Sequence, residues 1–410
     1  MTRLCRATVN SSSPHTGARP AVLHVVWNLI RGGTEGQCAR MAMHFAQAGT
    51  RHRVAVFRRE GYFLEAVEAL CGKVYEVEIR HLARLSTLRS IYRLSRFIRA
   101  ERFDVVHCWD AESVLFGSVA ARWAGVPFIT SRRDMSEIYP AWKLRWMDWA
   151  DRRAVAIVVN AEAIRRQRMA AGCREDKLHL VPNILDIDEF DRQAQAAPPL
   201  PETMGPRDVE EPWIVSVTRL DPEKDVHTLL HAFQRVVQDQ PAARLVIAGD
   251  GVERQALAER ARALGIQHRV SFLGDVPGVP ALLRQCALGV LTPKANEGLA
   301  NTLLEYMAAG LPIVATDCGG NREILARSGA GPWVGPGEVA ELADAICHLL
   351  KNPVEMEAHG QKGRIYVQNH RPEAAGQIMD GIYSQALNLD IAPAAAMSID
   401  PRVGGGAPDA

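Results

Sequence analysis

Two glutamates stand out in the stretch NEGLANTLLEYMAAGLPIVATDCGGNREI, residues 296–324, because the segment around them is mostly apolar and punctuated by glycine. LGVLTP (288–293) has the composition of a strand, and the residues from 301 onward have that of a helix, with Asn301 or Thr302 near its N-cap and Gly310 at its end. Glu297 would then lie in the loop after the strand, and Glu305 about one turn into the helix. This spacing predicts that the two carboxylates contact different parts of one ligand, with a helix N-terminus between them that favours a phosphate group.

A second group of charged residues lies in VSVTRLDPEKDVHTLLHAF (215–233), where a strand is followed by a loop and a helix. Arg219 and Lys224 lie in the predicted loop. Two cations in such a place can neutralise a diphosphate as it becomes a leaving group. The sequence shows no dense carboxylate cluster of the kind that holds Mg²⁺, so we expect neither a cofactor nor an obligatory metal.

The elements that would position these residues alternate between short apolar β-rich runs and amphipathic segments. This pattern is typical of a parallel sheet covered by helices on both faces, and it occurs twice, so we predict two doubly wound α/β domains facing one cleft. In such sheets, ligands bind at the carboxyl ends of the strands. The predicted strands lie in 21–30, 52–57, 103–109, 125–131 and 155–160, and then in 213–220, 243–251, 269–276, 288–293 and 311–317.

The predicted organisation has six parts. Between the two domains, AQAAPPLPETMGPRDVEEP (194–212) is rich in proline and acids and reads as a linker. Both ends lack the pattern of packed structure and are expected to be disordered. The parts are a disordered segment 1–20, an N-terminal domain 21–193, the linker 194–212, a C-terminal domain 213–370, a helix 371–388 that crosses back to the first domain, and a disordered tail 389–410.

Composition narrows the class of protein. The chain has 410 residues, 47% hydrophobic and 23% charged, which is typical of a globular protein, and it has no apolar run long enough for a membrane-spanning helix. Its eight cysteines are far apart, so we expect reduced thiols in a cytoplasmic protein. Residues 1–180 hold 29 Lys and Arg against 17 Asp and Glu, a net charge of +12, whereas residues 181–410 carry −11. No recognition module accompanies the basic half, so no nucleic-acid partner is expected.

At this point the motifs resemble a known family. VTRLDPEKD, ARLVIAGDGVERQAL, RVSFLGDV, the block around Glu297 and Glu305, and VGPGEVAELADAICHLLKNPVEMEAHGQKGR resemble the nucleotide-binding domain of retaining glycosyltransferases of family 4 (glycosyl transferases group 1), which have the GT-B fold. The first half is similar more loosely, through RGGTEGQ, DVVHCW, ARWAGVPFIT and VPNILDIDEF.

The resemblance implies roles for individual residues. Glu297 would contact the donor sugar near the reacting carbon, Glu305 would bind the ribose hydroxyls, and Arg219 and Lys224 would hold the diphosphate. The further residues implied in donor binding are Gly32, Gly33, Val276 near the base, and the backbone of Gly298, Leu299, Ala300 and Asn301.

The implied reaction is transfer of a sugar from a nucleotide diphosphate donor, taken as a UDP-sugar from family frequency, to a hydroxyl acceptor with retention of anomeric configuration. The departing phosphate oxygen would take the acceptor proton. The leading hypothesis for the acceptor is a lipid-linked or exopolysaccharide precursor of the cell envelope, and the alternative is a soluble acceptor. Where the family commonly has a histidine, TSRRDM has Arg133, so Arg132, Arg133, Asp134 and His107 are predicted as cleft residues without an assigned role. VPNILD also replaces the usual Asn-Gly of the family, and Lys294 its usual serine.

Two basic segments raise the possibility of membrane contact. Residues 79–102 carry seven arginines and one acid on an apolar helical repeat, and 139–153 place Trp142, Trp146 and Trp149 on one helical face. Such helices favour the surface of an anionic membrane, which predicts a cytoplasmic enzyme bound peripherally to the inner face. The alternative is that the apolar stripes pack on the sheet and the arginines are solvated.

Two other functions fit the same fold. A nucleotide-sugar epimerase would share both domains but would carry its own acid and base carboxylates, and the spacing of Glu297 and Glu305 argues against it. The second is a non-catalytic binding or scaffold protein on the same fold, such as one that binds sugar nucleotides, and the intact donor motifs argue against it. We therefore take a glycosyltransferase as the leading hypothesis.

Overall fold

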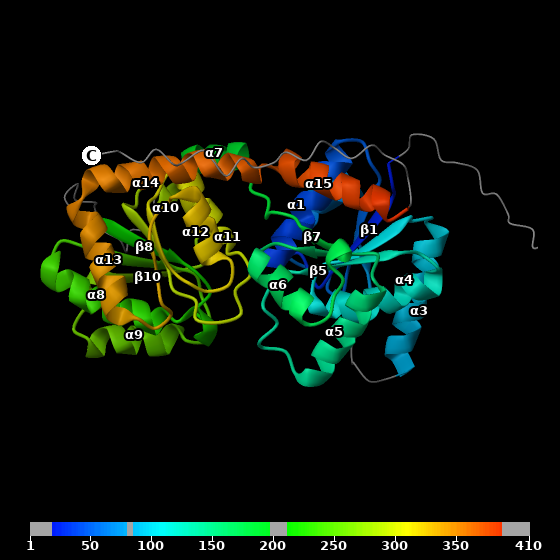
Figure 1. The fold of residues 1–410 in the computed structure, drawn as a ribbon, viewed down its shortest axis with the longest axis horizontal. Coiled ribbons are helices and arrows are strands. Elements are labelled where there is room, and N and C mark those ends of the chain that lie inside the picture. Colours follow the sequence, from blue (N-terminus) through cyan, green and yellow to red (C-terminus); the bar gives the residue numbers. More distant parts are fainter. Residues whose placement is uncertain (1–18, 80–84, 197–210, 388–410) are drawn as a thin grey trace, which may run out of the picture.

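The computed structural model describes residues 19–79, 85–196 and 211–387. These residues form two α/β domains that lie side by side (Figure 1). The predicted disordered ends 1–20 and 389–410 lie almost entirely outside the described residues, as does most of the predicted linker 194–212. Within the described part, no helix is both long enough and apolar enough to cross a membrane.

Within residues 19–79 and 85–186, the N-terminal domain is built on seven parallel strands in the order β3-β2-β1-β4-β5-β6-β7. Most of its strand residues are buried because helices cover both faces of the sheet. Sequence reasoning found five of these strands and missed β3 and β7, which are only two and three residues long. The strands are β1 (Val22–Val26), β2 (His52–Val56), β3 (Tyr75–Glu76), β4 (Val105–Cys108), β5 (Phe128–Arg132), β6 (Ala156–Val159) and β7 (Leu178–Leu180).

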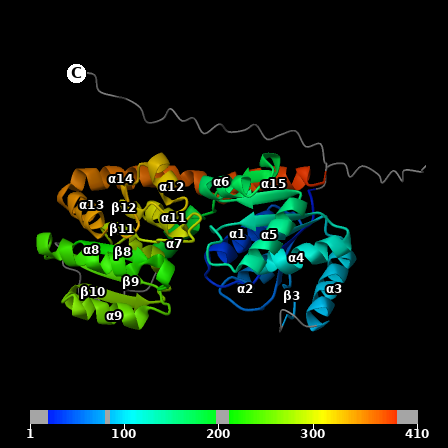
Figure 2. The same cartoon turned by 60° about the horizontal axis from the view of Figure 1, so that its bottom comes forward.

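Two groups of helices cover this sheet. Helices α3, α4 and α5 lie next to one another on one face (Figure 2), where Leu23 and Val25 of β1 join their core. Val22 and Val26 point to the opposite face and join a second core with α1 and with α15 (Pro372–Gln385) from the end of the described chain. The alternation along β1 therefore divides the domain into two apolar layers. The helices are α1 (Gly33–Gln47), α2 (Leu64–Cys71), α3 (Leu85–Ala100), α4 (Ala111–Ala124), α5 (Ala141–Arg153) and α6 (Glu162–Ala170).

In the described part of the C-terminal domain, from residue 211 onward, six parallel strands repeat this plan in the order β10-β9-β8-β11-β12-β13. Again the sheet lies between two apolar layers. The strands are β8 (Trp213–Val217), β9 (Arg244–Ala248), β10 (Val270–Gly274), β11 (Leu288–Leu291), β12 (Ile313–Thr316) and β13 (Trp333–Val334). The helices are α8 (Val226–Asp239), α9 (Arg254–Ala263), α10 (Val279–Leu283), α11 (Asn301–Ala309), α12 (Asn321–Ser328), α13 (Val339–Lys351) and α14 (Pro353–Tyr366).

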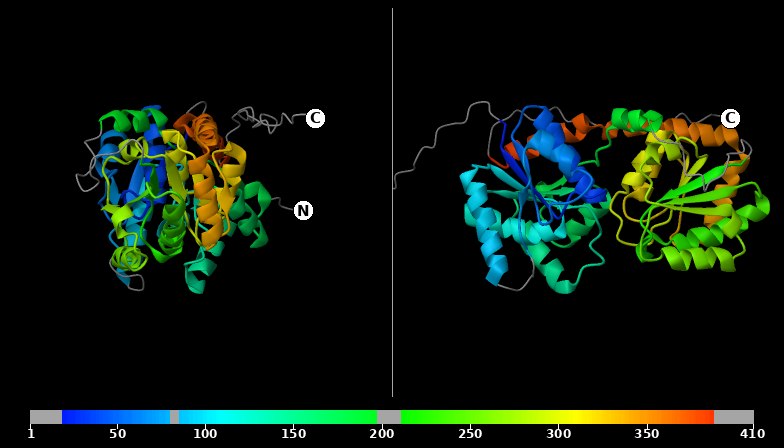
Figure 3. Two further views of the ribbon diagram at one scale, coloured as in Figure 1. Left: turned by 90° about the vertical axis from the view of Figure 1, so that its left-hand side faces the viewer. Right: turned by 180° about the vertical axis from the view of Figure 1, so that it is seen from behind.

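Two segments connect the domains along one edge of the molecule (Figure 3). The first leads into α7 (Ile187–Ala196), whose Ile187 and Phe190 join the core of the C-terminal domain. The predicted domain boundary at residue 193 therefore falls inside a helix, and the chain crosses over before Ile187. The second is α15 (Pro372–Gln385), which packs on α1 of the N-terminal domain through residues such as Met379 and Tyr383.

Candidate active site

The loops that follow β8 and β11 bring Lys224 and Glu297 together. Strands β8 and β11 are neighbours in the sheet, so the loops at their carboxyl ends meet at one edge. Lys224 Nζ lies 2.6 Å from Glu297 Oε2, and both side chains are largely shielded from solvent. The resemblance assigns both residues to one ligand, and the structure shows that they also pair with each other.

Arg219 lies at the surface beside this pair. Its guanidinium contacts Asp221 at 2.7 Å and Glu223 at 3.2 Å, and its side chain is 69% exposed. Exposed ion pairs of this kind contribute little to stability. A ligand that offers a stronger anion can therefore draw the guanidinium away at small cost.

Glycines allow the chain around Glu297 to pack tightly. A Cβ atom at Gly298 would collide with the backbone carbonyl of Arg133, which belongs to the other domain. Gly319 has a φ of +59°, and a Cβ there would collide with the carbonyl of Glu297. Gly320 N donates a 2.6 Å hydrogen bond to the carbonyl of Gly298. Gly319 and Gly320 thus pack directly against the loop that carries Glu297, and a Cβ atom at Gly319 would collide with the backbone of that loop.

Glu305 faces the N-terminal domain across the gap between the domains. Burial raises the pKa of its carboxyl group, while Arg40 and then Arg31 oppose that shift. Arg31 also donates a 3.4 Å hydrogen bond from Nη1 to the carbonyl of Val276. Arg31 therefore lies close to both Glu305 and Val276. Glu305 lies on α11, whereas Glu297 lies in the loop before that helix.

Arg40 was missed by the sequence reasoning. It lies on α1, and burial lowers its pKa, against the effect of Glu305 and Asp186. The available signal was a single arginine in the otherwise apolar run CARMAM of the helix that follows the glycine turn. A lone charge on such a face needs a partner, and here the partner lies on the other domain.

Asn301 begins α11, but it does not cap the helix as predicted. Ala300 is the N-cap residue, and no side chain caps this helix end. Asn301 instead turns toward the N-terminal domain, where Nδ2 donates to the carbonyl of Gly33 at 3.2 Å and Oδ1 accepts from Gln37 at 3.1 Å. The N-cap side chain therefore accepts no hydrogen bond from the first backbone N–H groups of α11. Such N–H groups at the start of a helix can bind an anion.

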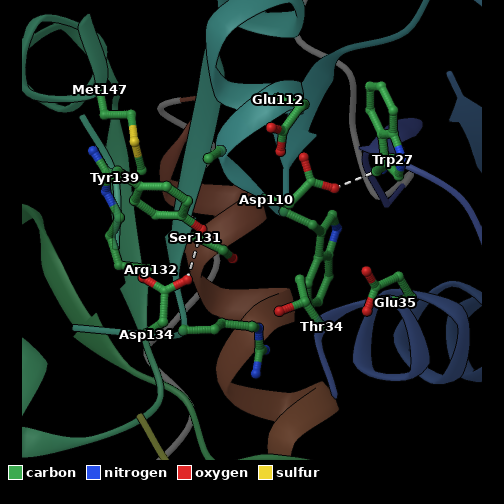
Figure 4. A pocket seen from close by; sticks show the side chains of 13 residues that line it. Trp27, Thr34, Glu35, Asp110, Glu112, Ser131, Arg132, Asp134, Tyr139 and Met147 are labelled. Carbon is green, nitrogen blue, oxygen red and sulfur yellow. Dashed lines mark hydrogen bonds between the residues drawn. The ribbon is translucent and has the colours of Figure 1, made fainter. Parts of the chain in front are cut away.

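A cavity of about 430 Å³ opens at the carboxyl ends of β1, β4 and β5 in the N-terminal domain (Figure 4). Its wall combines aromatic rings with carboxylates, a lining suited to a polyhydroxylated molecule. The lining includes Trp27, Thr34, Glu35, Trp109, Asp110, Glu112, Ser131, Arg132, Arg133, Asp134, Tyr139 and Met147.

Two carboxylates that line this cavity form hydrogen bonds that hold the surrounding loops in place. Asp110 caps α4 through Ser113 N and also accepts from Trp27 N, and burial raises its pKa to about 7. Asp134 accepts hydrogen bonds from Ser136 and from Tyr139 OH at 2.8 Å. Both carboxylates therefore fix the loops that shape the cavity.

The two predicted arginines of this loop differ in their partners. Arg132 lines the cavity, yet its guanidinium binds Asp151 of α5 through Nε at 3.0 Å and Nη2 at 2.9 Å. Arg133 also lines the cavity, lies with its guanidinium over Trp109 at 4.8 Å, and donates to Asn183 Oδ1 at 2.6 Å. Burial lowers the pKa of Arg133 to about 10. Of the two, Arg133 reaches toward the other domain, and Arg132 is held within its own.

His107 does not line the cleft, contrary to the prediction. It is fully buried in the N-terminal domain, and both of its ring nitrogens are 2.8 Å from a partner, Nδ1 from Tyr383 OH and Nε2 from Ser131 Oγ. The reason is that β4 is a central strand and that α15 covers this part of the sheet. His107 packs beside two further buried histidines, His24 and His52, which share a 2.8 Å hydrogen bond.

Because these histidines are buried, we expect the unfolding free energy of the protein to fall in acid. Burial is the largest cause that lowers the pKa of His24, His52 and His107, and for His52 the pKa falls to about 2. Below about pH 6.5 the unfolded chain binds protons at these imidazoles and the folded chain does not, so the unfolding free energy falls as the pH falls. Urea unfolding at pH 7.5 and 5.5 measures this. In His52→Gln the dependence should weaken by up to about 1.4 kcal/mol per pH unit, and equal slopes for both proteins would contradict the assignment.

Comparison with known proteins agrees with this geometry. The family model described as "Glycosyl transferases group 1" matches residues 205–366, and that described as "Glycosyltransferase Family 4" matches residues 31–189. The two matches lie one after the other and fall on the C-terminal and N-terminal domains.

Curated relatives match over most of the chain. A phosphatidyl-myo-inositol mannosyltransferase of Mycobacterium leprae is 26% identical over 85% of this chain and 92% of its own length. A 2-deoxystreptamine glucosyltransferase of Streptomyces kanamyceticus is 28% identical over 62% of this chain and 68% of its own length.

Among solved structures, Anabaena HepE in complex with UDP and glucose superposes with a TM-score of 0.79 at 22% identity, covering 89% of this chain and all of that one. The lipopolysaccharide biosynthesis glycosyltransferase WaaG superposes with a TM-score of 0.68 at 16% identity, covering 88% of this chain and 99% of that one. The fold is therefore GT-B, as the sequence predicts.

Proposed function

The chain belongs to the glycosyltransferases of group 1, family 4, and from this premise we propose that it is a retaining enzyme that moves a sugar from a UDP-sugar to a hydroxyl group. The observation that carries the proposal is the pair formed by Lys224 and Glu297 at the ends of neighbouring strands, beside a helix N-terminus without a side-chain cap. Glu305 faces the same gap from one turn further along that helix.

In the proposed reaction, the bond between the anomeric carbon and the β-phosphate oxygen breaks and a bond from that carbon to the acceptor oxygen forms. The acceptor proton passes to the departing phosphate oxygen. Arg219, Lys224 and the N-terminus of α11 stabilise the negative charge that develops on the diphosphate. Glu297 holds the donor sugar, and Glu305 holds the ribose. We propose that these cations make a metal dispensable.

For the acceptor, we propose that the reacting hydroxyl enters through the 430 Å³ cavity of the N-terminal domain. Its aromatic rings and carboxylates suit a sugar or cyclitol ring. A relative named a phosphatidyl-myo-inositol mannosyltransferase supports a lipid-linked acceptor, such as a precursor of an envelope glycan.

Incubation with a panel of nucleotide sugars, with and without lipid extracts as acceptors, tests the proposed function. We expect one UDP-sugar to be consumed, with UDP released, in the presence of EDTA as well as in its absence. NMR of the product should show the anomeric configuration of the donor. Binding without turnover across all acceptors would favour the non-catalytic alternative, and epimerisation without an acceptor would favour an epimerase.

We also propose that α5 and α3 contact an anionic membrane surface. On α5, Trp142 and Trp146 are 55% and 44% exposed, and Arg145 is exposed between them. On α3, Ile91, Leu94 and Ile98 pack in the core, as the alternative interpretation requires, but Leu88 and Tyr92 remain exposed among arginines. Residues 80–84 of the predicted segment lie outside the described residues.

Vesicle binding tests this surface. Vesicles that contain phosphatidylglycerol should retain the protein at low salt and release it at high salt, because the attraction is screened. The double variant Trp142→Ser/Trp146→Ser should bind at least about tenfold more weakly, since two interfacial anchors are lost. Trp333→Ser, which changes an exposed tryptophan of the other domain, is the control. No retention of the wild-type protein at low salt would remove this part of the proposal.

A further inference from the structure

Asn183 joins the two domains through a single carboxamide group. It lies on the segment that crosses from the N-terminal domain to α7, and its side chain is buried. Its Oδ1 accepts from Arg133 Nη1 at 2.6 Å and from Asn160 Nδ2 at 3.1 Å, and both donors belong to the N-terminal domain. Its Nδ2 donates to the carbonyl of Leu299 at 3.0 Å and to Asn301 Oδ1 at 2.7 Å, and both acceptors belong to the C-terminal domain.

The orientation of this amide is fixed by a chain of hydrogen bonds that begins at the backbone. Ile184 N donates to Gln37 Oε1 at 2.6 Å, and Gln37 Nε2 donates back to the carbonyl of Ile184 at 2.9 Å. Gln37 is thereby held with its Nε2 toward Asn301 Oδ1, so Asn301 must present an acceptor. Because Asn301 Oδ1 is an acceptor, the atom of Asn183 that faces it must be the donor Nδ2. A flipped amide at any of these positions would oppose two donors or two acceptors.

We propose that Asn183 is a positioning residue, whose two-sided amide holds the donor-binding turn 298–301 in register with Arg133 at the acceptor cavity. This inference rests on the proposed function. The turn contains the start of α11, and Arg133 lies on the cavity wall, so the amide sets the separation between the donor diphosphate and the acceptor. A displacement of 1 Å between reacting groups lowers the rate far more than it weakens binding.

The chemistry of the amide decides which substitution is informative. Asn183→Asp keeps the shape and the acceptor side, and it strengthens the bond to Arg133. It places a carboxylate oxygen against the carbonyl of Leu299 and against Asn301 Oδ1, where the amide donated, and this repels the C-terminal domain. Asn183→Ala removes both sides and adds no charge, so its effect should be smaller than that of Asn183→Asp.

The experiment measures kcat and KM for the donor, together with the radius of gyration from small-angle X-ray scattering with and without UDP. For Asn183→Asp we expect kcat to fall at least about tenfold, KM to change less than about threefold, and the radius of gyration to increase. Asn352→Asp, at an exposed position outside the cleft, is the matched control and should behave as the wild-type protein.

Wild-type kcat and scattering in Asn183→Asp would overturn the proposal, and so would an equal loss in Asn352→Asp. If Asn183→Asp unfolds near the assay temperature, Asn183→Ala provides the same comparison. If the wild-type protein transfers no sugar, the proposed function fails, but the scattering difference between Asn183→Asp and wild type still tests whether the amide holds the domains together.

Discussion

Glu297→Gln should lower kcat for sugar transfer by about 10²–10³, with a smaller change in KM for the donor, because a group that positions the donor sugar near the reacting carbon acts mainly in the transition state. The substitution keeps the size of the side chain but replaces the charged partner of Lys224 by a neutral amide. The measurement is the initial rate of UDP release at saturating donor and acceptor. A kcat within threefold of the wild-type value would contradict the role of Glu297.

A loss of rate must be separated from a loss of folded protein. Lys224 and Glu297 are both largely shielded, so Glu297→Gln leaves a partly buried cation without its partner, and the thermal midpoint should fall by a few degrees at most. Together with Glu297→Gln, the variant Lys224→Met and the double variant Lys224→Met/Glu297→Gln form a double-mutant cycle. Because the two residues act on one ligand, their effects on kcat should be far from additive. Additive effects on kcat would show that the two residues act independently and would contradict a shared ligand.

Asp151→Ala should destabilise the protein by about 3–5 kcal/mol, because it leaves buried cations without a counter-charge. Asp151 is fully buried on α5, where it binds Arg132, lies 3.5 Å from Arg168 Nε, and accepts a 2.8 Å hydrogen bond from Thr130. Urea unfolding gives the difference. Asp176→Ala is the control, since Asp176 forms an exposed pair with Arg174, and this substitution should cost far less stability than Asp151→Ala.

The consequence of Asp151→Ala extends to the active site. Arg132 ends β5, and the next residue is Arg133, whose guanidinium contacts Asn183. Loss of the ion pair should loosen this strand end and lower activity at temperatures where the protein is still folded. An Asp151→Ala variant as stable as Asp176→Ala would show that the buried pair contributes nothing.

The sequence alone predicts the parts of this structure that follow from local composition. Runs such as AIVV of β6 or IVAT of β12 can be read as buried strands, and glycine breaks and charged residues mark the loops after them. The meeting of Lys224 and Glu297 follows from the rule that the carboxyl ends of parallel strands lie at one edge. That rule needs no knowledge of side-chain geometry.

Other features depend on contacts between residues far apart in the chain. The sequence of the strand that carries His107 is similar to those of the neighbouring strands. His107 is kept out of the cleft because Tyr383 of α15 packs over it and forms a hydrogen bond with its ring. Asn183 and Arg40 are single polar residues in apolar stretches of the sequence. Each interacts with the C-terminal domain, Asn183 through its hydrogen bond to Asn301 and Arg40 through the charge of Glu305, which opposes the fall in the pKa of Arg40. Arg132 is the last residue of β5 and binds Asp151, whereas Arg133 lies just beyond the strand and contacts Asn183. One position along the chain therefore separates an arginine held within its own domain from one that contacts the segment between the domains.

A crystal structure of the protein with a UDP-sugar bound would test the proposed donor site without relying on activity. We expect Glu305 within about 3 Å of a ribose hydroxyl, the diphosphate at the N-terminus of α11 near Arg219 and Lys224, and the sugar against Glu297. A nucleotide bound elsewhere, or one whose ribose lies away from Glu305 and whose diphosphate does not meet α11, would contradict it.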